Sequence, residues 1–231
     1  YARIEEICSH IRKNPAQYSD FKIYPCMPYA HKYANAVTEM GIAGTLKHYT
    51  AGNIISTIAR GGLAVVQRDA FKLMEILVDT EMSMFRGMDV RVIFLQNVVT
   101  DLFLGLGMCE FFYEFNRYVK EKYDAEAGFI TMNLPMLVNA LETVGIVEPI
   151  VCASINKIGF RVSGGMEKYK QVLETKKVRA VAMQVYAAGA LKPKDALEYV
   201  CKIRGIESIL FGASSRAHIE QTYNLINSLS Q

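Results

Sequence analysis

The chain has 231 residues, of which 51% are hydrophobic and 21% charged, and its formal net charge is +3. This composition is typical of a globular protein with a sizeable core and argues against a disordered or low-complexity chain. The sequence contains no run of five like charges and no basic stripe with interleaved aromatic residues, so we expect no nucleic-acid partner.

The most apolar stretch, residues 90–106, is interrupted by Arg91, Gln96, Asn97 and Asp101, which would be costly in lipid. We therefore expect a strand followed by a helix there and no membrane span. The five cysteines are widely spaced and include no C-x-x-C pair, so we expect neither a metal site nor a redox motif. They are interpreted as reduced, mostly buried thiols of a cytoplasmic protein.

Residues 1–13 have the pattern of an amphipathic helix, so we expect a first strand to be missing before Tyr1. From residue 21 onward, short apolar runs alternate with longer segments of helical period, which is βαβα organisation. The predicted strands cover residues 21–27, 43–49, 90–96, 127–133, 149–155, 178–184 and 207–213, and the predicted helices cover about 30–40, 52–60, 64–85, 101–122, 134–145, 164–175, 193–204 and 215–229.

The strands are apolar over most of their length, as expected when both faces of a parallel sheet are covered. Together with a missing first strand they would number eight, which predicts an α/β fold of the parallel (β/α)8 TIM-barrel type. No linker or longer repeat divides the chain, so residues 1–231 are predicted to form one domain. A doubly wound open sheet is the competing architecture. Glycines 41, 145 and 205 are expected to end helices, and Ser214 or Ser215 to cap the last one.

In such barrels, polar residues that follow the strands line the active site. The segments YAAGA (186–190) and FGASSR (211–216) place small residues after the last two strands, where backbone N–H groups and a helix N-terminus can bind phosphate. The alternative is that Gly212 and Ala213 only form a tight turn and Ser215 only caps a helix.

Two lysines, Lys47 and Lys157, follow strands and could form a Schiff base in a dry pocket. The structural alternative is that each is solvated at the rim of the barrel. His48 is a candidate site residue, whereas His31 is interpreted as a surface residue. The aromatic run CEFFYEFNRY (109–118) could face a core or an interface, and we expect it to face the core.

Three segments resemble the aldo/keto reductase superfamily, and their order and spacing agree across about two thirds of the chain. They are LMEILVDTEMSMFRGMDVRVIFLQ (73–96), GFITMNLPMLVNALETVGIVEPIV (128–151) and LFGASSRAHIEQTYNLI (210–226). The resemblance implies an eight-stranded barrel that binds NADP or NAD in extended form, with a tyrosine acid helped by a lysine, an aspartate and a histidine.

Carried over residue by residue, the resemblance implies that Tyr29 is the acid, because it lies five residues after Tyr24, which occupies the aspartate position. Tyr33 is a second candidate for the acid. Lys47 falls at the end of the third strand, and Gln96 occupies the histidine position. Gln96 can donate a hydrogen bond to a carbonyl oxygen but cannot shuttle a proton.

The resemblance also implies a cofactor site. Asn133 matches the asparagine that contacts the carboxamide, and we add Gln184, which ends a later strand, to the cofactor residues. The last helix carries Gln221 and Thr222 where the family has glutamate and asparagine. The turn that would contact the adenosine phosphate consists of Gly212, Ala213, Ser214, Ser215 and Arg216.

The sequence therefore predicts an NAD(P)-dependent oxidoreductase of aldo/keto reductase type that acts on a small carbonyl substrate. The first alternative is a lyase or aldolase that acts on a phosphorylated substrate through Lys157 or Lys47. The second is a barrel that has lost reductase chemistry and binds a ligand, since two catalytic positions carry other residues.

Overall fold

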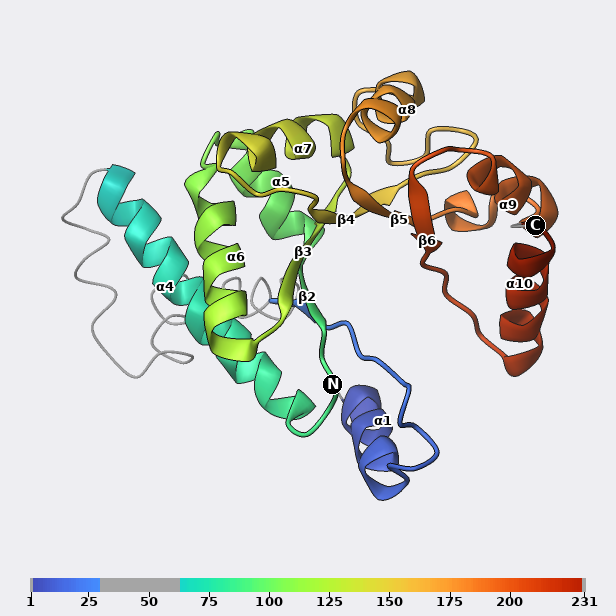
Figure 1. Cartoon of the computed structure of the whole chain (residues 1–231), viewed down its shortest axis with the longest axis horizontal. Coiled ribbons are helices and arrows are strands. Elements are labelled where there is room, and N and C mark those ends of the chain that lie inside the picture. The colour runs from blue at the N-terminus through green and yellow to red at the C-terminus, as the bar shows by residue number, and fades with distance from the viewer. Residues whose placement is uncertain (1, 30–62, 230–231) are drawn as a thin grey trace, which may run out of the picture. The chain divides into compact units, whose positions relative to one another are not determined.

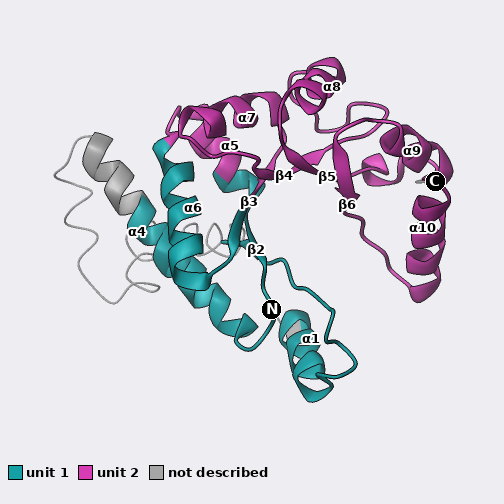
Figure 2. Ribbon diagram, viewed as in Figure 1, with its two compact units in different colours: residues 1–99, 110–127 teal, residues 100–109, 128–231 magenta. Residues whose placement is uncertain are grey.

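The computed structural model describes residues 2–29 and 63–229, and Figure 1 shows the arrangement of its elements. The chain forms two compact units, which Figure 2 distinguishes by colour. Unit 1 contains residues 1–99 and 110–127, and unit 2 contains residues 100–109 and 128–231. The expected single domain over the whole chain stays a prediction.

Six β-strands form one parallel sheet in the described part of the chain, which confirms the predicted α/β class. The strands follow one another in the sheet as they do in the sequence, β1-β2-β3-β4-β5-β6. In register, Met27 lies beside Leu95, and Ala153 lies beside Ala182. The strands are β1 (Cys26–Met27), β2 (Val92–Leu95), β3 (Glu126–Thr131), β4 (Ile150–Ser154), β5 (Arg179–Met183) and β6 (Ile206–Ile209).

Every strand predicted within the described residues overlaps an observed strand. β1 is the shortest, because only residues 26–27 of the predicted 21–27 join the ladder and Ile23 forms an isolated bridge with Val90. The strand predicted at 43–49 lies outside the described residues, as do the helices predicted at about 30–40 and 52–60.

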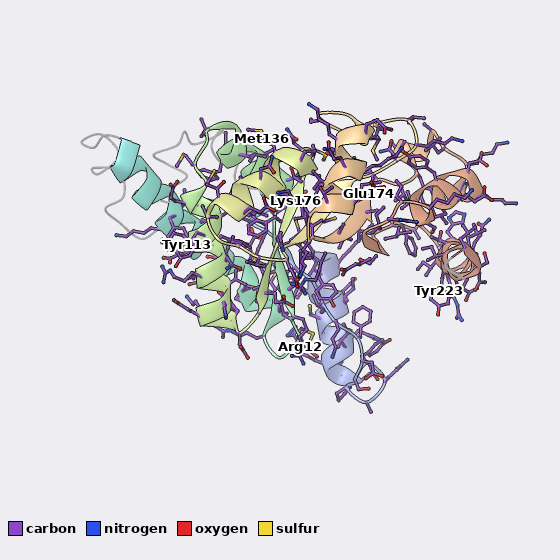
Figure 3. The ribbon with its side chains drawn as sticks, turned by 45° about the horizontal axis from the view of Figure 1, so that its top comes forward. Arg12, Tyr113, Met136, Glu174, Lys176 and Tyr223 are labelled. Carbon is purple, nitrogen blue, oxygen red and sulfur yellow. The ribbon has the colours of Figure 1, made fainter. Side chains whose placement is uncertain are left out.

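Unit 1 has a core of aromatic and aliphatic side chains. Phe111, Phe112 and Phe115 of the FFYEF run are buried, whereas Tyr113 of the same run is exposed (Figure 3). The expected core role of this run is thereby confirmed, since its apolar residues recur at helical spacing. The helices that lie mainly in this unit are α1 (Ala2–Lys13), α4 (Leu63–Met82), the 3-10 turn η1 (Ser83–Phe85) and α6 (Glu110–Tyr123).

Unit 2 is built around β4, whose five residues are all buried. A strand covered on both faces has no side exposed to solvent, which is why its sequence, IVCAS, is an almost continuous apolar run. The remaining helices are α5 (Asn97–Gly105), α7 (Leu134–Thr143), α8 (Met166–Thr175), the 3-10 turn η2 (Ala187–Gly189), α9 (Pro193–Cys201) and α10 (Arg216–Leu229).

One predicted helix is wrong. The segment predicted as a single helix at about 101–122 forms two helices, α5 and α6, separated by residues 106–109. Gly107 has φ +68 in this break, a left-handed conformation that interrupts a right-handed helix. The hydrophobic periodicity continues through residues 106–109, so the sequence pattern does not indicate the break.

The predicted helix ends and caps are confirmed in part. Gly145 follows the C-cap of α7 and has φ +75, the left-handed conformation expected of a residue that ends a helix. Gly205 also has a positive φ, +85, but α9 ends earlier, at Cys201, so Gly205 does not end that helix. The hydroxyl oxygen of Ser215 accepts the backbone N–H of His218 at 3.3 Å, so Ser215 caps α10. Gly41 lies outside the described residues.

The cysteines agree only in part with the expectation. None of the five, all of which are described, forms a disulfide. Cys8 and Cys152 are buried, but Cys26 is exposed and Cys109 and Cys201 are intermediate, so the prediction of mostly buried thiols is wrong.

Two features of the described residues bear on the class of protein. None of the described helices combines the length and apolar character that crossing a bilayer requires. Within the same residues, no group of three or more histidine, cysteine, aspartate or glutamate side chains is arranged to hold a metal ion.

Candidate functional site

In unit 1, Tyr29 and Gln96 follow the neighbouring strands β1 and β2. The backbone N–H of Gln96 donates to the carbonyl oxygen of Met27 at 3.1 Å, so Gln96 lies at the carboxyl end of β1 as well as β2. Tyr29 lies two residues beyond Met27, and its side chain is exposed. The structure therefore keeps these two predicted catalytic residues at the same end of the β1–β2 pair.

The backbone of Tyr29 is fixed by a carboxylate that the sequence did not indicate. Its N–H donates to both carboxylate oxygens of Glu81, at 3.0 and 3.1 Å. Glu81 lies on α4 and is only 4% exposed. A hydrogen bond to a buried charged group is among the stronger ones in proteins, so Glu81 holds the chain where β1 ends.

Several predicted residues of the catalytic set fall elsewhere. Lys47, His48, His31 and Tyr33 lie outside the described residues. Tyr24, at the position where the resemblance implies an aspartate, has a side chain that is 54% exposed. Its phenol therefore does not supply the buried carboxylate that the resemblance implies.

In unit 2, polar side chains meet at the carboxyl ends of β3, β4 and β5. The hydroxyl of Ser154 lies 2.8 Å from the side-chain oxygen of Gln184 and 2.9 Å from the sulfur of Met132. Asn133 follows Met132 directly, and its side-chain oxygen accepts the backbone N–H of Met136 at 3.4 Å, which caps α7. Ser154 thus links the ends of three strands that lie side by side in the sheet.

The side-chain amide nitrogens of Gln184 and Asn133 find few hydrogen-bond acceptors among the described residues. Among the described residues, the side-chain nitrogen of Gln184 has no hydrogen-bond acceptor. The side-chain nitrogen of Asn133 donates only to the sulfur of Met136, at 3.7 Å, and a thioether is a weak acceptor. Both residues can therefore donate to the oxygen of a bound amide or carbonyl group.

The segment after β5 has an unusual backbone. Gln184, Ala187 and Ala188 have φ values of +55, +49 and +56, and Gly189 follows at +89. For residues other than glycine, this left-handed conformation costs roughly 1–2 kcal/mol each, and such strain is concentrated at functional sites. The conformation of Gln184 directs its amide toward Ser154, which makes a binding role for this segment worth testing.

Replacing Ala188 by glycine is expected to raise the free energy of unfolding by about 0.5–1 kcal/mol, because glycine adopts positive φ without steric cost. Ala188 is exposed, so the substitution removes little packing. The matched control is Ala190→Gly, since Ala190 is also exposed but has φ −71, and it should lower stability. Urea denaturation monitored by circular dichroism measures the free energy of unfolding of both variants. Equal changes in the two variants would show that the backbone at Ala188 is not strained.

The predicted phosphate turn lies next to this cluster in the sheet. The backbone N–H of Leu210 donates to Ala182 at 2.8 Å, which brings the turn at residues 212–216 to the end of β5. Arg216 is almost fully exposed and pairs with Glu220 one helical turn later, at 2.7 Å. The turn therefore combines the small residues Gly212 and Ala213 with an exposed guanidinium group.

Several polar side chains in and near this turn already make hydrogen bonds within the protein. The Ser214 hydroxyl lies 3.2 Å from Nδ1 of His218, and Ser215 serves as the cap of α10. The hydroxyl of Thr222, which is buried, lies 3.1 Å from the Tyr186 hydroxyl. Thr222 thus connects α10 to the segment after β5, and it is engaged at the position that the resemblance assigns to cofactor recognition.

One acidic residue at this end was missed by the sequence analysis. Asp101, on α5, accepts hydrogen bonds from the Thr131 hydroxyl at 2.5 Å and from the backbone N–H of Met132 at 3.1 Å. Burial raises the pKa of Asp101, although both hydrogen bonds act in the opposite direction. Asp101 therefore holds the end of β3 against α5, a contact between residues 30 positions apart that no local pattern indicates.

Tyr169 supports the same strand end from α8. Its buried hydroxyl donates to the carbonyl oxygen of Met132 at 2.6 Å. Burial, together with the charge of Asp101, raises the pKa of Tyr169 to about 12. A phenol with this pKa stays neutral near pH 7 and serves as a hydrogen-bond donor to the backbone.

Lys157, the Schiff-base candidate within the described residues, is exposed just beyond β4. An exposed ammonium keeps its hydration, so Lys157 does not lie in the dry pocket expected of a Schiff-base lysine. The side chain beside it, Asn156, is buried, and both of its polar groups bond to the backbone of Phe160 at 2.7 and 2.8 Å.

No protein-family model matches the chain, no curated protein matches it, and no solved structure matches it. The class of protein that the structure defines is an α/β protein with a parallel sheet and polar residues gathered at the carboxyl ends of its strands. This end of a parallel sheet is where ligands of such folds usually bind.

Proposed function

We propose that the protein is an NAD(P)-dependent oxidoreductase of aldo/keto reductase type that reduces a small carbonyl substrate. The observation that carries the proposal is that the side chains of Asn133, Ser154 and Gln184 lie at the carboxyl ends of β3, β4 and β5, where the Ser154 hydroxyl donates to the Gln184 side-chain oxygen. A nicotinamide ring presents a carboxamide, and side-chain amides are suited to bind that group through paired hydrogen bonds.

The residues present fit the cofactor in two places. The Gln184 amide nitrogen has no acceptor among the described residues, so a carboxamide oxygen would satisfy it. The turn at 212–216 offers small residues and the exposed Arg216 guanidinium, which can bind a phosphate in bidentate fashion. When bound, the cofactor supplies a hydride, and the protein's part is to bind and orient the reactants.

In this proposal, residues of unit 1 act on the carbonyl substrate. In this proposal the Tyr29 hydroxyl donates the proton to the carbonyl oxygen, Lys47 assists it, and the Gln96 side-chain amide orients that oxygen by hydrogen bonding. Glu81 fixes the backbone of Tyr29 through two hydrogen bonds, so it positions the acid without touching substrate. Gln96 cannot transfer a proton, so all proton transfer is assigned to Tyr29.

The proposal includes a closed (β/α)8 barrel. The strand order in the described sheet follows the sequence without the reversal that marks the switch point of a doubly wound sheet. Such an order is typical of barrels, in which the carboxyl ends of all strands open on one face.

The experiment is a fluorescence titration of the purified protein with NADPH and with NADH. We expect micromolar dissociation constants that rise at least 10-fold in Gln184→Ala, because an amide hydrogen bond and its strand-end partner are lost. Gln171→Ala is the matched control, since Gln171 is an exposed glutamine on α8 away from the strand ends.

Absence of binding at millimolar cofactor would overturn the proposal, as would equal effects of the Gln184 and Gln171 variants. If the protein binds NADPH but Tyr29→Phe retains full turnover with carbonyl substrates, the assignment of the acid is wrong. A chain that binds the nucleotide without turnover would match the ligand-binding alternative, which Gln96 and Tyr24 at two catalytic positions favour.

A further inference from the structure

Asn133 and Met136 make two contacts with each other at the start of α7. The Asn133 side-chain oxygen accepts the Met136 backbone N–H at 3.4 Å, and its side-chain nitrogen donates to the Met136 sulfur at 3.7 Å. The backbone N–H of Asn133 donates to the Thr131 hydroxyl at 2.8 Å, which fixes the residue where β3 ends. The Met136 sulfur is therefore held beside one of the two amide nitrogens that can donate to a bound ligand.

Met136 is also the most accessible methionine in the part of the chain that the structure describes. It is 47% exposed on α7 (Figure 3), whereas the other described methionines are buried or of intermediate exposure. The neighbouring Met132 is of intermediate exposure, and its sulfur lies 2.9 Å from the Ser154 hydroxyl. A peroxide must reach a thioether to oxidise it, so Met136 is the described methionine most open to oxidation.

Oxidation changes the hydrogen bonding of this side chain. The sulfur lone pair attacks one oxygen of hydrogen peroxide, the S–O bond forms while the O–O bond breaks, and the departing hydroxide takes the proton of the transferred oxygen and leaves as water. The sulfur is oxidised by two electrons and the peroxide is reduced, so no further reactant is needed. A thioether is a weak acceptor, whereas methionine sulfoxide carries a polar S=O group whose oxygen is a strong one.

We propose that Met136 is a site of reversible oxidation by peroxide, and that its sulfoxide oxygen accepts the side-chain N–H of Asn133. The weak contact with the sulfur then becomes a full hydrogen bond, and the Asn133 amide no longer donates to a ligand at the strand ends. Because Met136 is exposed, its sulfoxide stays in contact with water and disrupts no core packing. Methionine sulfoxide reductases return the sulfoxide to the thioether, which makes the change reversible.

Limited treatment of the full chain with hydrogen peroxide, followed by peptide mass spectrometry, tests the site of oxidation. We expect Met136 to gain one oxygen about 10-fold faster than Met108, which is 6% exposed, because access of the oxidant limits the reaction. Oxidation of Met108 as fast as that of Met136 would overturn the proposal.

Proton–nitrogen NMR of the side-chain amides tests the new hydrogen bond without any ligand. The Asn133 resonance is identified by its absence from Asn133→Asp. On oxidation we expect it to move to higher proton frequency, since the N–H gains a stronger acceptor. The amide of Gln171, an exposed glutamine on α8, is the reference and should not change. An Asn133 resonance that oxidation leaves in place would overturn the proposal.

Met136→Leu is the matched variant, because it removes the sulfur and keeps an apolar side chain at an exposed position. Peroxide should leave its Asn133 resonance unchanged. The cysteines and the other methionines are the same in both chains, so the difference between the chains isolates Met136. The same shift of the Asn133 resonance in both chains would show that another oxidised residue causes it, and the proposal would fail.

The consequence for binding rests on the proposed function. Oxidation should raise the NADPH dissociation constant of the parent chain about 10-fold, because one amide donor is lost, and should leave that of Met136→Leu unchanged. An equal loss of affinity in both chains, or none in the parent chain, would overturn the effect on binding. If neither form of the parent chain binds NADPH, the proposed function fails, and the Asn133 resonance alone decides the proposal for Met136.

Discussion

Replacing Gly205 by alanine is expected to lower the free energy of unfolding by about 3 kcal/mol. An alanine Cβ built at this position would lie 2.5 Å from the carbonyl oxygen of Leu173, a backbone atom of α8. The residue also has φ +85, which costs a side chain roughly 1–2 kcal/mol, and overpacking adds about 1–3 kcal/mol. The midpoint of thermal unfolding should fall by roughly 6–12 °C.

Gly145→Ala separates the two causes. Gly145 has φ +75, but an added Cβ there meets nothing within 4 Å. Replacing Gly145 by alanine should lower the free energy of unfolding only by the cost of the positive φ, about 1–2 kcal/mol. Thermal melts followed by circular dichroism measure both variants, and a Gly205 variant no less stable than the Gly145 variant would mean that α8 does not approach Gly205 this closely.

Replacing Asp79 by alanine is expected to lower the free energy of unfolding by about 2–3 kcal/mol. The Tyr118 and Tyr123 hydroxyls and the Lys122 ammonium all donate to the Asp79 carboxylate, which joins α4 to the end of α6. Hydrogen bonds to charged groups contribute about 1.5–3 kcal/mol each. The total is smaller than their sum because the Asp79 side chain is 38% exposed and solvent can replace part of the bonding.

The same carboxylate makes stability depend on pH. Burial acts to raise the pKa of Asp79, but hydrogen bonds from Lys122, Tyr118 and Tyr123 outweigh it and hold the pKa below its ordinary value. A lowered folded-state pKa means that the stabilisation is present above the unfolded value near pH 4 and is lost as pH falls through the folded value. Asp79→Ala should therefore unfold with a shallower acid dependence than the parent chain.

Arg117→Ala is the control on α6. Arg117 pairs with Glu114 and Glu121 on the helix surface and is 43% exposed, so its loss should lower stability much less than the loss of Asp79. Urea denaturation at pH 7 and pH 4 compares the variants. If the Asp79 and Arg117 variants lose equal stability at pH 7, the α4–α6 contact is not held by the carboxylate.

The elements of the fold could be predicted largely because their signals are local. Apolar runs of strand length and segments of helical period are read within one window, and Gly145 and Ser215 mark helix boundaries through the conformations they adopt. The division between α5 and α6 was not predicted, although two glycines, Gly105 and Gly107, lie at it. The hydrophobic periodicity continues across these glycines, and it led to the prediction of a single helix.

The candidate site could be predicted only in part because its contacts are not local. The ends of strands identified Asn133 and Gln184 as candidate site residues, since ligands of parallel sheets bind at the carboxyl ends of the strands. The contacts of Asp101 with Thr131 and of Glu81 with Tyr29 join residues 30 and 52 positions apart. Both carboxylates lie within helices whose sequence pattern indicates only which face is apolar.

Little of the final helix, α10, is buried. Thr222 is buried there, while Ile219 and Tyr223 are exposed, as Figure 3 shows for Tyr223. A helix with few buried contacts opens locally at a smaller free-energy cost than the fold as a whole, so its amide hydrogens exchange with solvent before those of β4. A ligand held by the turn before α10 would slow this exchange, and the helix itself would then report occupancy of the turn.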